Sequence, residues 1–186
     1  MAVDLELFKG VAGSFPAGVA VVTARAPGAE PRGLTSNAIC SVSADPPQLL
    51  VCVDKRSQTL PAIRAAGSFV VNFLAAGREE LAERFASKHP DKLAGVTLEP
   101  SPIAGGAPIL VDDVVAVAEC VVAQEVDAGD HWIFIGRIEA GAVHERVPLM
   151  YYRRAYAPWP RPSLPLVAVG AASPDAADWA FHWDFH

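Results

Sequence analysis

The sequence predicts a mainly β protein, an antiparallel barrel with helices inserted between its strands. Five runs rich in β-branched residues have the length of strands, and several are bounded by Pro, Gly or Asp. They cover residues 19–23, 48–53, 68–73, 114–122 and 131–138. Turn residues at 127–130 join the last two runs into a hairpin, and strands do not alternate regularly with helices as in a doubly wound sheet. No G-x-G-x-x-G follows a strand, which argues against a Rossmann nucleotide site.

Helices are expected at three places in the chain. The first is capped by Asp4 and ends near Gly13. Its apolar residues fall on one face and are Leu5, Phe8, Val11 and Ala12. Helical patterns also fit residues 59–66 and 78–86. Shorter strands are expected over residues 33–36, 41–43 and 149–152.

The chain has 186 residues, of which 52% are hydrophobic and 19% are charged. This is enough for one sizeable core and too little for two ordinary domains. We therefore expect one domain over residues 1–157 and a tail over 158–186 that is rich in Pro and Trp. The tail is expected to dock on the barrel or on a neighbouring subunit, because its aromatic side chains would be costly to leave in water. These aromatics include Trp179, Phe181, Trp183 and Phe185.

The charge pattern argues against several classes of partner. The net charge is −6, and the fifteen basic residues are scattered rather than clustered, so nucleic acid is not expected to bind. No segment reaches the roughly 20 apolar residues of a membrane helix, and the acidic N-terminus lacks the basic start of a secretory signal. We expect a cytoplasmic protein without membrane contact.

No metal or disulfide chemistry is expected. The three cysteines Cys40, Cys52 and Cys120 lack C-x-x-C spacing, and their apolar or small neighbours favour buried free thiols. His182 and His186 are four residues apart, but two ligands do not make a metal site.

Two polar segments have the composition of nucleotide-binding loops. Residues 35–38 carry hydroxyl and amide groups that suit the carbonyl and nitrogen edge of a flavin ring. A polar turn between two strands is the alternative. Residues 54–59 place two cations and two hydroxyls before a helix, which is typical of a phosphate cradle. The alternative here is a solvated turn in which Thr59 caps the helix.

His131 is the candidate catalytic residue. A turn that contains Gly129 and Asp130 delivers its imidazole onto a strand, at the rim of the β structure. A single histidine on a strand is often structural, so the position alone leaves both readings open.

Taken together and in this order, the segments resemble the short-chain flavin reductase family, the NAD(P)H:flavin oxidoreductase components of two-component flavin-dependent monooxygenases. The resemblance runs from about Phe8 to Tyr156 and includes residues 129–136 as the nicotinamide-side signature. It implies the FMN-binding split barrel, a mainly β antiparallel fold, and a homodimer. It also implies an NADH-dependent enzyme that reduces FAD or FMN by direct hydride transfer and supplies diffusible reduced flavin to a separate monooxygenase. The alternatives are a flavoprotein of the same barrel class with a prosthetic flavin, a non-catalytic flavin-binding protein, and a structural interaction module.

The resemblance also implies roles for individual residues. The flavin-ring contacts are Thr35, Ser36, Asn37, Ala38, Ser41, Val42 and Ser43. The phosphate site is Asp54, Lys55, Arg56, Ser57 and Thr59, and the pocket is completed by Asn72, Phe85, Ala86 and Ser87. His131 orients the nicotinamide rather than acting as a base. Tyr152 and Arg153 face the pyridine nucleotide, unless the tyrosines of this edge strand simply alternate into the core. NADH is expected over NADPH because nothing marks a pocket for a 2′-phosphate, and FAD is expected over FMN.

Overall fold

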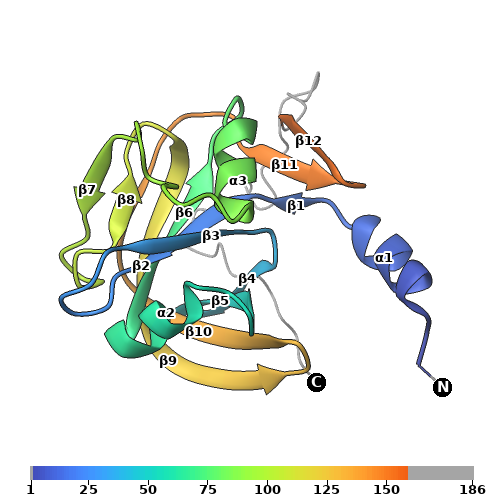
Figure 1. Cartoon of the computed structure of the whole chain (residues 1–186), viewed down its shortest axis with the longest axis horizontal. Coiled ribbons are helices and arrows are strands. Elements are labelled where there is room, and N and C mark those ends of the chain that lie inside the picture. Colours follow the sequence, from blue (N-terminus) through green and yellow to red (C-terminus); the bar gives the residue numbers. More distant parts are fainter. Residues whose placement is uncertain (1, 159–186) are drawn as a thin grey trace, which may run out of the picture.

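The computed structural model describes residues 2–158. Three helices and twelve strands follow one another in this part of the chain (Figure 1). In order they are α1 (Leu5–Gly13), β1 (Ala17–Gly18), β2 (Ala20–Ala24), β3 (Arg32–Ser36), β4 (Ile39–Ala44), β5 (Pro47–Asp54), α2 (Leu60–Ala66), β6 (Ser68–Leu74), α3 (Glu79–Ala86), β7 (Leu98–Pro100), β8 (Pro108–Leu110), β9 (Val114–Ala128), β10 (His131–Val143), β11 (Leu149–Tyr152) and β12 (Ala155–Pro158). The expected tail and its two histidines lie outside the described residues, apart from Pro158.

One large antiparallel sheet dominates the fold. Its strand order is β3-β2-β6-β9-β10-β5-β4, and every neighbouring pair in it is antiparallel. Smaller sheets of β1-β11-β12 and of β7-β8 complete the β structure. The mainly β, antiparallel prediction with inserted helices is therefore confirmed. No pairing within residues 2–158 joins β3 to β4, so the large sheet is not a closed barrel.

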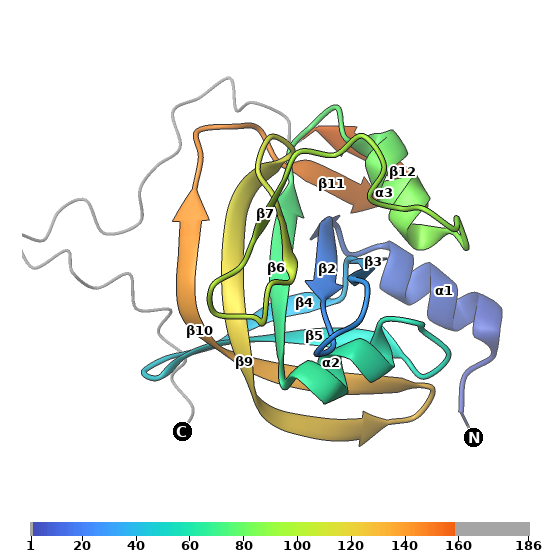
Figure 2. The same ribbon diagram turned by 60° about the vertical axis from the view of Figure 1, so that its left-hand side comes forward.

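The β9–β10 hairpin is longer than the sequence predicts. The strands reach Ala128 and His131, and only Gly129 and Asp130 separate them, with Gly129 at a φ of 66°. The outer half of β9 is rich in polar residues, so the hydrophobic pattern does not predict a strand there. Pairing with β10 keeps this half extended. Figure 2 shows both strands bending as they run through the sheet. The bend accompanies register shifts between Ile135 and Gly136 and between Ile138 and Ala140.

The predicted helices are present. Asp4 caps α1 by accepting a hydrogen bond from the backbone N–H of Leu7 at 2.8 Å. Thr59 is the N-cap residue of α2, but its side chain makes no capping bond, so the hydroxyl cap of the alternative interpretation is not present. Three short strands besides β1 were not predicted. β7 and β8 have three residues each and β12 has four, which is too short for a clear alternation of polar and apolar residues.

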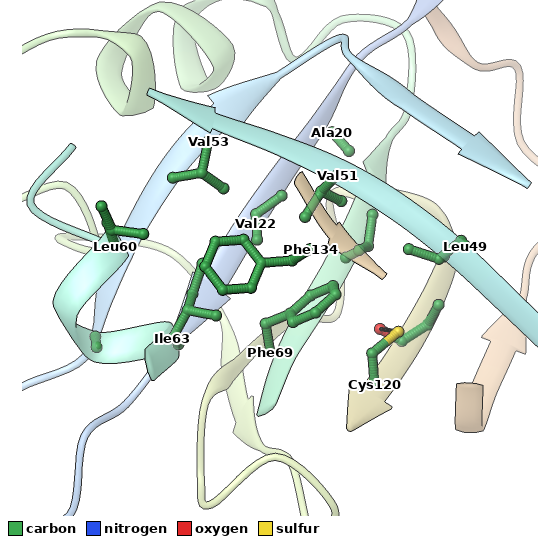
Figure 3. Packing of buried hydrophobic residues seen from close by; sticks show 14 residues of the cluster. Ala20, Val22, Leu49, Val51, Val53, Leu60, Ile63, Phe69, Cys120 and Phe134 are labelled. Carbon is green, nitrogen blue, oxygen red and sulfur yellow. Dashed lines mark hydrogen bonds between the residues drawn. The ribbon is translucent and has the colours of Figure 1, made fainter. Parts of the chain in front are cut away.

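Two hydrophobic clusters form the core. In the first, Phe69 and Phe134 pack with Val51 and Ile63 between the large sheet and α2 (Figure 3). The second lies under α3 and includes Phe85. Gly136 is required by the first cluster, because a Cβ there would lie 2.6 Å from Phe69 Cζ and 2.8 Å from Cys120 Cβ.

The cysteines differ in burial. Cys120 is buried as predicted, and burial raises the pKa of its thiol to about 12. Cys52 is half-buried, and burial raises its pKa as well. Cys40 is exposed on the edge strand β4, so the prediction of a buried thiol is wrong there. An edge strand with a pattern of apolar and small residues can leave either face open to solvent.

None of the helices in residues 2–158 is long and apolar enough to cross a membrane.

Candidate active site

A cavity of about 900 Å³ lies where four segments meet. Residues 30–38 form one wall along β3, and Cys52 with residues 54 and 56–59 form another at the end of β5. The end of α3 and the loop after it contribute residues 85–93. His131 completes the lining from the first position of β10.

The structure brings most of the predicted site residues to this cavity. They are Thr35, Ser36, Asn37, Ala38, Asp54, Arg56, Ser57, Thr59, Phe85, Ala86, Ser87 and His131. Seven others do not line it, namely Ser41, Val42, Ser43, Lys55, Asn72, Tyr152 and Arg153.

The wall along β3 is polar at its rim and anchored below. Thr35 donates its hydroxyl hydrogen to the carbonyl of Ala82 at 2.6 Å, which ties β3 to α3. The Ser36 side chain is buried and accepts from the backbone N–H of Ala38 at 3.1 Å. Asn37 and Ala38 are exposed beside the cavity. The anchored hydroxyls therefore hold the turn, and the exposed amide and backbone groups are the ones that a ligand can reach.

The second wall is organised around Asp54. Its carboxylate accepts from the Arg56 backbone N–H at 2.7 Å, from Nε at 3.1 Å and from Nη2 at 2.8 Å. These hydrogen bonds, together with the positive charge, hold the pKa of Asp54 well below its usual range. Ser57 accepts from the backbone N–H of Thr59 at 3.2 Å. The segment is thus a rigid turn that presents a guanidinium and a hydroxyl.

His131 lies opposite Asp54 in the β5–β10 register. Its Nδ1 is 2.7 Å from Oδ1 of Asp130, and this hydrogen bond lowers the pKa of the Asp130 carboxyl. The side chain is 41% exposed. Since Asp130 occupies Nδ1, Nε2 is the ring nitrogen that can face a ligand in the cavity.

The floor is apolar and depends on Gly33. Phe85 is buried, yet its ring borders the cavity. A Cβ on Gly33 would lie 2.6 Å from Phe85 Cε1, so only glycine allows β3 to approach α3 this closely. A flat aromatic ligand can therefore pack on an apolar surface while its edge meets polar groups.

Sequence reasoning missed a group of cations in the loop after α3 and on the facing strand. Lys88, His89 and Lys92 line the cavity together with Arg32. Lys92 Nζ donates to the Phe85 carbonyl at 2.7 Å and to the Gly33 carbonyl at 3.3 Å. Burial and the charge of Arg32 lower the pKa of Lys92. Among residues 2–158, no carboxylate forms an ion pair with Arg32, Lys88 or Lys92. The charged residues between 88 and 92, directly after the predicted helix, were the sequence signal that could have indicated these cavity residues.

The predicted residues outside the cavity have other surroundings. Asn72 is fully buried; its amide donates to the Val21 carbonyl at 3.1 Å and accepts from Leu110 N–H at 2.9 Å. Tyr152 is 42% exposed, so it does not alternate into the core of its strand. Arg153 follows it in the β11–β12 turn at a φ of 47°. Ser41, Val42 and Ser43 lie on the edge strand β4.

Within the described residues, no three His, Cys, Asp or Glu side chains are grouped as metal ligands. The site therefore has the composition of a pocket for an anionic aromatic ligand, with polar, cationic and apolar sectors.

Comparison with known proteins agrees with this fold. The flavin reductase like domain family matches residues 12–160, and the chain belongs to this family. The family expected from the sequence is thereby confirmed. The chain is 48% identical over 169 residues to a flavin reductase (NADH) of Kitasatospora aureofaciens, covering 90% of this chain and 88% of that protein.

Two further relatives extend the comparison. The flavin-dependent monooxygenase reductase subunit HsaB of Rhodococcus jostii is 35% identical over 156 residues, covering 83% of this chain and 78% of the relative. The solved structure of the NADH:FAD oxidoreductase SgcE6 of Streptomyces globisporus has a TM-score of 0.79 at 32% identity. That match covers 87% of this chain and 98% of the other.

Proposed function

We propose that this chain is an NADH-dependent flavin reductase. It reduces FAD or FMN and supplies the diffusible reduced flavin to a separate monooxygenase. The observation that carries the proposal is the meeting of His131 with residues 35–38 and 54–59 at one cavity of about 900 Å³. Relatives in the same family are named flavin reductase (NADH) and monooxygenase reductase subunit, which supports this assignment.

The reaction requires alignment more than acid–base chemistry. A hydride, which is two electrons and one proton, leaves C4 of the nicotinamide and joins N5 of the flavin, so NADH becomes NAD⁺ as the flavin is reduced. Holding two rings at reacting distance removes much of the entropic barrier, an effect worth up to about 7–11 kcal/mol in well-oriented systems. The apolar floor at Phe85 supports one ring, and His131 orients the other through Nε2.

The walls of the cavity divide the remaining tasks. The exposed groups of Asn37 and Ala38 meet the polar edge of the flavin ring. Arg56 and Ser57 bind the flavin phosphate with side-chain donors. Asp54 accepts from Nε and Nη2 of Arg56, so Nη1 is the guanidinium nitrogen that donates to the phosphate. This assignment does not depend on the N-terminus of α2, which has only seven residues.

We expect FAD rather than FMN as the flavin. The volume of about 900 Å³ is near the upper end of the roughly 300–1,000 Å³ of small-molecule sites. Arg32, Lys88 and Lys92 line the cavity beside Glu30 and Asp91, but no carboxylate of the described residues forms an ion pair with these three cations. A second phosphate and its adenosine would compensate this charge. NADH is the preferred hydride donor because the relative with 48% identity is named for it.

The enzyme is a homodimer, and its large sheet is the split barrel of the family. α1 projects from the body of the subunit and has no buried residue (Figure 1). Phe8 is 57% exposed, Val11 67% and Phe15 76%. A contiguous apolar face of this kind is typical of a protein interface, and a second copy would cover it. The predicted contacts of Ser41, Val42, Ser43, Tyr152 and Arg153 belong to this dimer, either at the second active site or at the interface.

The first test is to mix the purified protein with NADH and to follow NADH absorbance without flavin, with FAD and with FMN. Rapid oxidation that depends on added flavin is expected, and it would be faster with FAD. Repeating the assay under argon should bleach the free flavin, which shows that reduced flavin leaves the protein. Flavin that stays bound during gel filtration and is reduced without release would point instead to a prosthetic group. No oxidation with either flavin, under NADH or NADPH, would contradict the proposal.

A further inference from the structure

The two cations of the 54–59 segment face different parts of the molecule. Arg56 lines the cavity, whereas Lys55 does not. Lys55 Nζ is 2.7 Å from Oδ1 of Asp127 on β9, and its backbone N–H donates to the Asp130 carbonyl at 3.0 Å. Lys55 therefore joins the end of β5 to the turn that precedes His131.

Trp132 connects this turn to α2. Its ring lies 4.4 Å from the guanidinium carbon of Arg64 and 5.3 Å from Lys55 Nζ, which are cation–π distances. Arg64 also donates from Nε to Glu125 of β9 at 2.7 Å. The indole is half-buried against the hydrophobic cluster of Phe69 and Phe134.

Because His131 is next to Trp132 on β10, contacts that hold Trp132 also restrain His131 at the cavity. His131 and Trp132 are successive residues of β10, so their side chains point to opposite faces of the sheet. His131 borders the cavity, and Trp132 is held by cations on the other side. Rotation of the strand end would move both side chains together. Neither ion pair, Lys55–Asp127 or Arg64–Glu125, is buried enough to stabilise the fold strongly. Their main effect is therefore to fix the position of the strand end.

We propose that Trp132 is a positioning residue for His131, and that Arg64 and Lys55 hold its indole for this purpose. The inference rests on the proposed function, because it assumes that His131 orients the nicotinamide. It assigns Lys55 to the hairpin instead of the flavin phosphate. The cluster of Lys55, Arg64, Glu125, Asp127 and Trp132 is called the hairpin clamp below.

A double-mutant cycle tests whether the clamp acts through His131. Trp132→Leu is expected to lower kcat/KM for NADH about tenfold, within the roughly 100-fold that a small misplacement can cost. The Kd for FAD should stay within about twofold, and Trp132→Phe should restore most of the activity because it keeps an aromatic face. In a His131→Ala background, Trp132→Leu should change kcat/KM by less than about twofold.

Two further variants distinguish an effect on His131 from a general loss of structure. Arg137→Met removes an exposed ion pair with Glu139 on the same strand and should leave kcat/KM unchanged. Arg64→Met keeps the indole and should give a smaller loss of about threefold, which tests the clamp if Trp132→Leu fails to fold. If Trp132→Leu lowers kcat/KM for NADH by the same factor with and without His131, or lowers FAD affinity in parallel, the inference is overturned. The proposed function would not be affected by that result. A wild-type protein that oxidises no NADH with any flavin would overturn the proposed function and the inference with it.

Discussion

Gly33 and Phe85 lie so close that a Cβ on the glycine would be 2.6 Å from Cε1 of the ring. The contact joins β3 to α3, and both residues border the cavity. The close approach of β3 to α3 beside the cavity therefore depends on the absence of one methyl group.

Gly33→Ala is expected to weaken flavin binding more than it destabilises the fold. The added Cβ pushes the Phe85 ring, which can shift into the open cavity, so the loss of stability should be near the low end of the ~1–3 kcal/mol of overpacked sites. Titration with FAD and urea unfolding measure the two effects. Gly18→Ala is the control, since a Cβ at Gly18 meets nothing within 4 Å and the residue does not need a positive φ. Unchanged FAD affinity in Gly33→Ala would show that the Phe85 ring does not support the flavin.

Gly136→Ala is expected to destabilise the fold more than it weakens flavin binding. Its Cβ would meet Phe69 and Cys120, which are both buried and do not line the active-site cavity. We expect a loss of stability near the upper end of ~1–3 kcal/mol. Urea unfolding monitored by fluorescence checks this. A wild-type midpoint would mean that the core cluster can repack around the methyl group.

Replacement of His131 should affect turnover rather than flavin affinity. His131→Ala removes the imidazole that we propose orients the nicotinamide, and we expect kcat/KM for NADH to fall up to about 100-fold. The Kd for FAD should change much less, because the flavin contacts lie on other segments. Stopped-flow reduction and fluorescence titration separate the two quantities. Collapse of flavin binding with normal turnover of the remaining holoenzyme would contradict the assigned role.

The two neighbouring cations should have separable effects. Arg56→Met is expected to weaken FAD and FMN binding about tenfold, as expected for the loss of one charge-assisted hydrogen bond to phosphate. Riboflavin, which has no phosphate, should bind the variant and the wild type equally. Lys55→Met should leave flavin affinity unchanged, because Lys55 does not line the cavity and its Nζ lies against Asp127 on β9. Equal loss of riboflavin affinity would assign Arg56 to the ring or to the loop structure instead.

The three thiols should react at different rates. Cys40 is exposed and should be labelled first by a thiol reagent, whereas Cys120 should react only after unfolding. The thiolate is the reactive form, and burial raises the pKa of Cys52, so its labelling should keep accelerating with pH above the ordinary thiol range. Bound FAD should slow Cys52, which lines the cavity. Mass spectrometry after timed labelling gives each rate. Equal labelling of Cys52 with and without FAD would place the flavin elsewhere.

Local patterns carried much of the prediction. Alternation and β-branched runs identify the main strands because these preferences act over a few residues. The hairpin at 127–130 follows from its turn residues, and the structure confirms it with Gly129 at positive φ. The outer half of β9, residues 123–128, and the end of β10, residues 139–143, are not predicted by such patterns. They are extended because each strand pairs with the other.

Sequence patterns alone were enough to predict the fold class, the family and most segments that border the cavity, since short-range preferences and motif order are encoded locally. Which side chains of those segments face the cavity is set by the tertiary structure. Lys55 and Arg56 are adjacent and alike in charge, but strand pairing turns Lys55 toward Asp127 and leaves Arg56 at the cavity. Asn72 faces the core, and the loop cations from Lys88 to Lys92 reach the cavity opposite β3. Such orientations depend on contacts between residues far apart in the chain, which no local pattern contains.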